Sequence, residues 1–236
     1  MSGGPAPARP SARTVLFDAG NTLIFLDYAR LAAGVGAALR RPLTGPQLEA
    51  VAADAARRLE VAKATDRERA TRYLESLFTL AGVPEAELGV VRDTLRELHL
   101  ERHLWGGVPA ATRPALDRLA AAGRRLGVVS NSDGRVESAL VAAGLRDAFE
   151  VVIDSALVGV EKPDPAIFSP ALDALGADPA TTLYVGDLYE VDVVGARAAG
   201  LDVVLVDPLG LHRHRTDVRA FPSVAAVVDH LLGPAA

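Results

Sequence analysis

Polar residues stand where several short apolar runs of the chain end, and their types suit chemistry on an anionic group. Asp18 ends the run TVLFD, and Ser130 ends the run LGVVS. Lys162 lies in VEKPDPAIF, while Asp187 and Asp192 lie in YVGDLYEVD. A carboxylate that follows four apolar or β-branched residues, as Asp18 does, is costly to bury unless it is paired or bound to a metal. These residues are therefore the first candidates for a reactive site.

Together, these side chains would place hard oxygen ligands beside one ammonium group. Carboxylates suit Mg²⁺, which prefers oxygen ligands and binds substrate phosphates. Lys162 would screen the charge on Asp18 and on a phosphoryl group, and Ser130 with nearby backbone N–H groups would hold phosphate oxygens. Asp18 could then attack phosphorus and pass the phosphoryl group to water.

Each place in the sequence also has an ordinary structural explanation. Ser130 and Asn131 could cap a helix or form a turn. The Gly-Asp pair that contains Asp187 could be a tight turn, with Asp192 solvated on a first helical turn. The segment EKPDP fits a turn, because its prolines favour extended residues before them. The chemical interpretation depends on these places meeting in the fold.

The elements that would bring them together are short apolar strands, predicted at 14–18, 126–130, 149–153, 182–186 and 202–206. Uninterrupted Val and Leu runs are typical of parallel strands that are buried on both faces. Helical stretches alternate with the later strands, at 110–122, 133–143, 165–175 and 190–199. This alternation predicts a doubly wound α/β fold, in which ligands lie at the carboxyl ends of the strands.

Residues 27–104 interrupt this alternation with helical segments near 28–40, 46–64, 66–81 and 85–102. The stretch TGPQ predicts a capping box, with Thr44 as the N-cap and Gln47 three residues later. We expect a helical cap domain at 27–104, inserted into a core domain made of 13–26 and 105–236. A module that follows the first strand could cover the site as a lid.

The composition narrows the possible partners of this chain of 236 residues. Its net charge of −5 argues against a nucleic-acid or membrane-surface binder. No apolar run reaches the length of about 18 residues that spans a bilayer, and the absence of cysteine excludes disulfides. We expect a cytoplasmic protein with a disordered tail at 1–12, whose oligomeric state the sequence leaves open. Only Lys63 and Lys162 are lysines, against 23 arginines, which favours a special role for a lysine.

The segments FDAGNTL, VVSN, EKPDPAIF and YVGDLYEVDVVGARAAG resemble, in order and spacing, the four motifs of the haloacid dehalogenase (HAD) superfamily. The resemblance extends over about residues 13–232. It implies a Rossmann-like core with a helical cap after the first motif. It also implies a Mg²⁺-dependent hydrolase of the phosphoric monoester class, which acts on a small phosphorylated metabolite through an aspartyl-phosphate.

The resemblance also assigns roles to single residues. Asp18 would be the nucleophile and Lys162 the charge-screening lysine. Thr22, Ser130, Asn131 and Lys162 would bind substrate phosphate. The metal would be held by Asp18, Gly20 (through its carbonyl oxygen), Asp187 and Asp192.

Gly20 departs from the family pattern, because phosphatases of this superfamily usually carry there a second aspartate that acts as acid and base. One hypothesis is a phosphatase that recruits another acid (Glu161, Asp164, Glu190 or a cap residue) or prefers acyl and aryl phosphates. A second is a dehalogenase- or phosphonatase-like enzyme, with Lys63 as a Schiff-base lysine in the phosphonatase case. A third is a catalytically weakened binding domain.

Four histidines can be explained without a role in catalysis. His99 and His103 are four residues apart and could share a helix face as zinc ligands, but a solvated or partner-facing pair explains them as well. His212 and His214, in GLHRHRTD, are predicted to lie in a charged surface loop.

Overall fold

The structure is a computed structural model that describes residues 12–58 and 66–235. The predicted tail lies almost wholly outside these residues, and so does Lys63. Contacts between residues divide the chain into two units, one of Met1–Phe25 with Gly107–Ala236 and one of Leu26–Gly106. We call them the core unit and the helical unit and describe each by itself.

The core unit is built on a six-stranded sheet in the order β5-β4-β1-β6-β7-β8. Each strand of this sheet runs parallel to its neighbours. This confirms the predicted doubly wound α/β core. The strands are β1 (Thr14–Phe17), β4 (Arg125–Ser130), β5 (Val151–Asp154), β6 (Thr182–Gly186), β7 (Asp202–Val206) and β8 (Arg219–Phe221). The last of these strands was not predicted.

Strand register brings the polar strand ends to one edge of the sheet. Phe17, the last residue of β1, pairs with Val128 of β4 and with Val185 of β6. The strands that precede Asp18, Asn131 and Asp187 are therefore direct neighbours, and β4 ends two residues and β6 one residue beyond the level of Phe17. Because parallel strands share one carboxyl edge, this arrangement creates a single place for a site.

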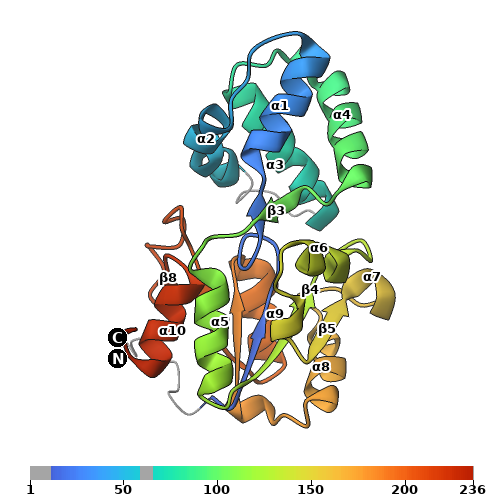
Figure 1. Cartoon of the computed structure of the whole chain (residues 1–236). Coiled ribbons are helices and arrows are strands. Elements are labelled where there is room, and N and C mark those ends of the chain that lie inside the picture. The colour runs from blue at the N-terminus through green and yellow to red at the C-terminus, as the bar shows by residue number, and fades with distance from the viewer. Residues whose placement is uncertain (1–11, 59–65, 236) are drawn as a thin grey trace. The chain divides into compact units, whose positions relative to one another are not determined.

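Helices cover the sheet on both faces. The core unit contains α5 (Thr112–Ala121), α6 (Val136–Ala142), α7 (Ser155–Val158), α8 (Ser169–Ala174), α9 (Val194–Ala198) and α10 (Val224–Leu232). Helices α5 and α10 pack side by side (Figure 1). On the other face, Ala171 of α8 and Ala196 of α9 pack against Leu16 and Tyr184 of the sheet. The sheet thus lies between two helical layers, with its carboxyl edge open to loops.

Short irregular helices replace parts of the predicted long ones. The predicted helix at 165–175 is the 3₁₀ turn η3 (Pro165–Phe168) followed by α8, and the one at 190–199 begins as the π-helix η5 (Tyr189–Val193). Single turns also occur as η2 (Arg146–Ala148) and η4 (Pro179–Thr181). Among the residues that the structure describes, no helix combines the length and the apolar character of a membrane span.

The helical unit contains α1 (Tyr28–Leu39), α2 (Gly45–Arg57), α3 (Asp66–Leu80), the 3₁₀ turn η1 (Glu85–Glu87) and α4 (Leu88–Glu101). Figure 1 shows these helices packed against one another, and their core includes Leu31, Leu48 and Phe78. The predicted capping box is confirmed, since Thr44 and Gln47 hydrogen-bond reciprocally at the start of α2. The strands β2 (Phe25–Leu26) and β3 (Trp105–Gly107) form a separate two-stranded sheet where the chain passes between the units.

Candidate active site at the carboxyl edge of the sheet

The buried ammonium group of Lys162 is the centre of the site. Its Nζ atom lies 2.7 Å from Asp18 Oδ1, 2.8 Å from Asp192 Oδ1 and 2.7 Å from the Tyr184 hydroxyl. An ammonium group has three N–H donors, so each donor has an acceptor. The Tyr184 hydroxyl in turn donates to the backbone oxygen of Val129, at 2.8 Å. This network fixes the position of the positive charge.

Burial and charge perturb the acid–base properties of these groups. Burial is the main cause that raises the pKa of Asp18 from 3.8 to about 6, against the opposing attraction of Lys162. For Lys162, burial would lower the pKa, but the carboxylates of Asp18 and Asp192 outweigh it and hold the pKa well above 10.5. Lys162 therefore keeps its proton over the whole physiological pH range.

The Asp18 carboxylate is held by one of its two oxygens. Oδ1 accepts hydrogen bonds from Lys162 Nζ and from Ser130 Oγ, the latter at 3.0 Å. Oδ2 accepts no hydrogen bond from the residues that the structure describes. This arrangement orients the carboxylate and leaves one oxygen available for a ligand or for attack.

The chain turns tightly after Asp18, through Gly20 and Thr22. The N–H of Asn21 donates to Ile24 O at 2.7 Å, and Asn21 adopts a left-handed conformation with φ 53°. Thr22 is only 1% exposed, yet its hydroxyl has no hydrogen-bond partner within the described part of the chain. Since buried hydroxyls are normally paired, Thr22 is a good candidate to bind a ligand oxygen.

Asp192 organises the loop that follows β6. Its Oδ2 accepts from the backbone N–H groups of Asp187 and Leu188, at 2.9 and 2.8 Å, while its Oδ1 binds Lys162. The carboxylate passes so close to Gly186 that a Cβ there would collide with it. Both oxygens of Asp192 are thus engaged inside the protein, and its predicted role as a direct metal ligand stays a prediction.

Asp187 is the more available carboxylate of this loop. It is partly buried and accepts a hydrogen bond from Asn21 Nδ2 at 3.3 Å. Burial, and then the neighbouring charges of Asp192 and Asp18, raise its pKa well above 3.8. A carboxylate in such surroundings is stabilised in its charged form by a bound cation.

Asn131 holds the segment that carries Lys162. Its Nδ2 donates to Lys162 O at 2.9 Å, and its Oδ1 accepts from Lys162 N at 2.8 Å. This pair of bonds gives Asn131 a positioning role, and its predicted contact with phosphate stays a prediction. The following bond, Lys162–Pro163, is cis.

Two residues at the end of β5, which the sequence did not single out, fix the loop after β4. The Asp154 carboxylate accepts from the N–H groups of Gly134 and Val136, at 3.0 and 3.2 Å. The Ser155 hydroxyl bonds both the N–H and the carbonyl oxygen of Ser132, at 3.0 and 3.2 Å. The loop that follows Ser130 is therefore held by a neighbouring strand.

The sequence also missed Tyr184 and His212. The signal for Tyr184 was an aromatic hydroxyl in the middle of a largely apolar strand, which needs a buried partner. His212 was predicted to be exposed, and this is wrong: it is 6% exposed, and its Nε2 lies 3.0 Å from Asp187 O. His214, two residues later, is exposed as predicted.

Three acids were considered as replacements for the acid that Gly20 lacks, and all are exposed: Glu161, Asp164 and Glu190. Two of them make interactions away from Asp18. Asp164 caps η3 by accepting from Ala166 N at 2.9 Å. Glu190 lies 3.8 Å from Arg215. Glu161 remains a candidate on sequence alone.

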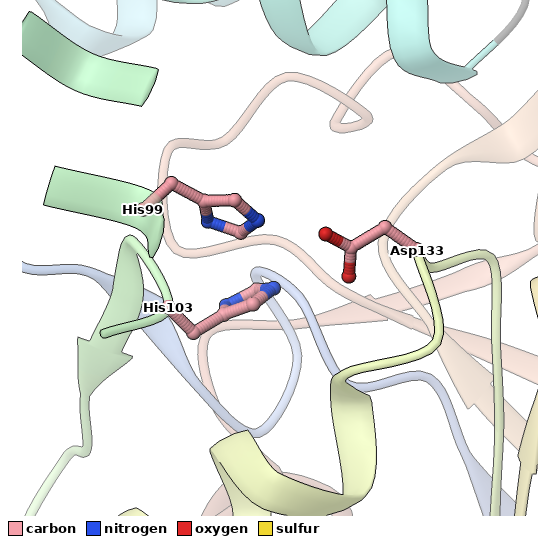
Figure 2. A group of neighbouring side chains, drawn as sticks. All are labelled: His99, His103 and Asp133. Atoms are coloured by element: carbon pink, nitrogen blue, oxygen red, sulfur yellow. The ribbon is translucent and has the colours of Figure 1, made fainter. Parts of the chain in front are cut away.

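In the helical unit, the rings of His99 and His103 contact each other edge to face, with centroids 4.7 Å apart (Figure 2). Their Nδ1 atoms accept from Leu104 N and Trp105 N, at 3.4 and 3.3 Å. Asp133, also drawn in Figure 2, belongs to the core unit. The zinc hypothesis for this pair stays a prediction.

Known proteins and a family model are similar to this chain. A family model described as haloacid dehalogenase-like hydrolase matches residues 12–200. Phosphatase MT3486 of Mycobacterium tuberculosis is 33% identical over 223 residues, which cover 93% of this chain and 98% of that protein.

A further curated relative and a solved structure match over different lengths. Haloacid dehalogenase-like hydrolase domain-containing protein 3 of Mus musculus is 40% identical over 130 residues, or 55% of this chain, and the match spans about half (51%) of that protein. The crystal structure of a dehalogenase has the same fold, with a TM-score of 0.63 at 21% identity, over 95% of this chain and 99% of that one.

Proposed function

Because the chain belongs to the haloacid dehalogenase-like hydrolases, we propose that it is a phosphatase in which Asp18 attacks the phosphorus of a small phosphorylated substrate. The observation that carries this proposal is the fixed Asp18 carboxylate. Lys162 and Ser130 bind only its Oδ1, so Oδ2 is the oxygen that can form the bond to phosphorus. The relatedness over nearly the full length to a protein named as a phosphatase supports the same reaction type.

The residues present fit a divalent cation with hard oxygen ligands. Asp18, Asp187 and Asp192 bring three carboxylates together against the single ammonium of Lys162, which leaves a surplus of negative charge. Asp187 and Asp18 would hold Mg²⁺, together with the carbonyl oxygen of Gly20, while Asp192 would position the loop. When bound, the ion would polarise the phosphoryl group and balance the charge of the carboxylates.

The chain's own residues would orient the substrate. Lys162 would attract the phosphate as a fixed positive charge, and the unpartnered hydroxyl of Thr22 would donate a hydrogen bond to one phosphate oxygen. Ser130 would donate to another once its hydroxyl turns from Asp18 Oδ1 to the substrate. Attack by Asp18 would form an aspartyl-phosphate as the bond from phosphorus to the leaving oxygen breaks, and water would then release inorganic phosphate and free Asp18. Lys162 would not protonate the leaving group, because its pKa is held well above 10.5.

The missing acid at Gly20 limits the substrate class. A leaving alcohol needs a proton, and general acid catalysis contributes about 10²–10⁴-fold. Acyl and aryl phosphates leave without much protonation, so we propose that they are better substrates than alkyl phosphates.

The absence of a carboxylate at Gly20 also favours a second candidate, a dehalogenase- or phosphonatase-like hydrolase. Halide leaves without a proton, and the resemblance implies that dehalogenases work without metal. The Asp187 carboxylate, which lies near those of Asp18 and Asp192, argues for a cation and against this candidate. Fluoride release from fluoroacetate in EDTA would support it. A binding domain without catalysis, the third candidate, would bind phosphorylated compounds but turn none over.

The experiment is a panel of acetyl phosphate, p-nitrophenyl phosphate and alkyl phosphates, with Mg²⁺ and with EDTA. We expect turnover with Mg²⁺, a burst of p-nitrophenol, and no activity in Asp18→Asn. Asp173→Asn, which removes an exposed carboxylate on α8, is the matched control and should behave as the wild type. Unchanged turnover in Asp18→Asn would contradict the proposal.

A further inference from the structure

His212 lies in the loop that follows β7, and none of the roles above uses it. Its side chain is only 6% exposed. Asp207, directly after β7, accepts from the backbone N–H groups of Leu211 and His212 through its two oxygens, each at 2.8 Å. The loop is thus closed on itself, and this closure sets the position of the imidazole.

The imidazole is directed by its contact with Asp187. Nε2 lies 3.0 Å from the backbone oxygen of Asp187. A carbonyl oxygen can only accept, so Nε2 carries a proton and donates it; this tautomer is assigned from the partner. The other nitrogen, Nδ1, is buried and has no hydrogen-bond partner among the described residues. The Asp187 carbonyl therefore accounts for the hydrogen bonding of this ring.

Asp187 is consequently held at three points. Asp192 Oδ2 accepts from its N–H at 2.9 Å, His212 donates to its carbonyl oxygen, and Asn21 Nδ2 donates to its carboxylate at 3.3 Å. The two backbone contacts fix the peptide groups on both sides of its Cα atom. The direction in which the Asp187 carboxylate leaves the backbone depends on these two contacts.

We propose that His212 is a positioning residue that sets the Asp187 carboxylate for a divalent cation. This inference rests on the proposed function, which places Asp187 among the ligands of that ion. Loss of a residue that hydrogen-bonds to a metal ligand commonly weakens metal affinity by about 10–100-fold. His212 reaches the ligand through its backbone carbonyl, so its loss should weaken ion binding without removing any ligand.

The test replaces His212 with two amide side chains of different length. In His212→Gln the side-chain N–H₂ can reach the place of Nε2, whereas in His212→Asn it is too short to do so. His214→Asn, at an exposed position of the same loop, is the matched control. The dissociation constant of Mg²⁺ is measured by isothermal titration calorimetry on metal-free protein and repeated with Mn²⁺ by EPR. Circular dichroism checks that each variant is folded.

We expect His212→Asn to raise the Mg²⁺ dissociation constant about 10–100-fold, with most of the affinity restored in His212→Gln and none lost in His214→Asn. The half-saturating Mg²⁺ concentration for turnover should rise in parallel, while kcat at saturating Mg²⁺ changes little. If His212→Asn does not fold, Asp207→Asn, which removes one of the two bonds that close the loop, should give a smaller rise.

Two results would overturn the inference, and they differ. Wild-type affinity in folded His212→Asn, or in Asp207→Asn where that variant stands in for it, would refute the role of His212 alone. A wild-type protein that binds neither Mg²⁺ nor Mn²⁺ would refute the metal site of the proposed function, and the role of His212 with it.

Discussion

Replacing Asp18 with asparagine is expected to stabilise the metal-free protein at pH 8 while it abolishes catalysis. Asp18 is 7% exposed, and burial is the main cause that raises its pKa from 3.8 to about 6. The folded chain thus binds this proton more tightly than the unfolded chain does. The resulting stability is fully present below about pH 4 and is lost as the pH rises through the folded pKa near 6.

The magnitude follows from the size of this shift. Folding raises the pKa of Asp18 from 3.8 to about 6. At ~1.36 kcal/mol for each pKa unit, ionisation of Asp18 at pH 8 lowers the free energy of unfolding by about 3 kcal/mol. Asparagine is neutral at every pH, and its Oδ1 can still accept from Lys162 and Ser130. We therefore expect Asp18→Asn to be more stable than the wild type by about 2–3 kcal/mol at pH 8, and the difference to shrink towards pH 4.

Urea unfolding followed by far-UV circular dichroism, in EDTA from pH 4 to pH 8, measures this difference. Asp173→Asn, the control for removal of an exposed carboxylate, should not reproduce the pH dependence. Addition of Mg²⁺ should selectively stabilise the wild type, because a ligand stabilises the state that binds it. A difference in stability that does not change with pH, or an asparagine variant that is less stable at pH 8, would refute the reasoning.

Three further substitutions test the buried network. Lys162→Met leaves the carboxylates of Asp18 and Asp192 without their cation, so it should lower the free energy of unfolding by about 3–5 kcal/mol at pH 8, and by less at pH 5, in urea titrations. Tyr184→Phe leaves one buried N–H of Lys162 unpaired and should cost about 1–3 kcal/mol in the same assay; no loss would show that the ammonium finds another acceptor. Thr22→Val should leave stability nearly unchanged, because the hydroxyl has no described partner, but should raise the inhibition constant of phosphate about fivefold; an unchanged constant would exclude Thr22 from the phosphate site.

The sequence predicted that the polar residues at the strand ends would lie at one edge of the sheet, because two simple rules determine their place in the fold. Apolar runs such as those before Asp18 and Ser130 form parallel strands, and parallel strands end at one edge. The convergence of Asp18, Ser130 and Asp187 follows once β1 lies between β4 and β6. Strand order alone does not place Lys162, which lies in the loop after α7 and is held there by Asn131.

The contacts that refine the site could not be predicted in the same way. Tyr184 contacts Lys162 because its side chain points to the face on which the segment after α7 returns, and that return path is set by tertiary packing. His212 is buried because Asp207 closes its loop, whereas the charged residues around it indicated a surface. The short strand β8 gave only a weak local pattern. These features depend on neighbours that are distant in the sequence. The helix α10 was also not predicted, although Ser223 caps it and its buried residues Val224, Val227 and Val228 have helical spacing.

Gly20 leads to a prediction about leaving groups. The ammonium group of Lys162 donates its hydrogen bonds to Asp18, Asp192 and Tyr184. Within this network of described residues, no acid is therefore placed to protonate the leaving alcohol. In a series of aryl phosphates, log kcat/KM should therefore fall steeply as the pKa of the leaving phenol rises, because negative charge accumulates on the leaving oxygen. Gly20 does not have a positive φ, so Gly20→Asp requires no left-handed backbone and should flatten this slope and raise turnover of alkyl phosphates about 10²–10⁴-fold. Gly20→Asn, which adds a similar side chain without an acid, is the control and should keep the steep slope. A flat series in the wild type would mean that another residue already supplies the proton.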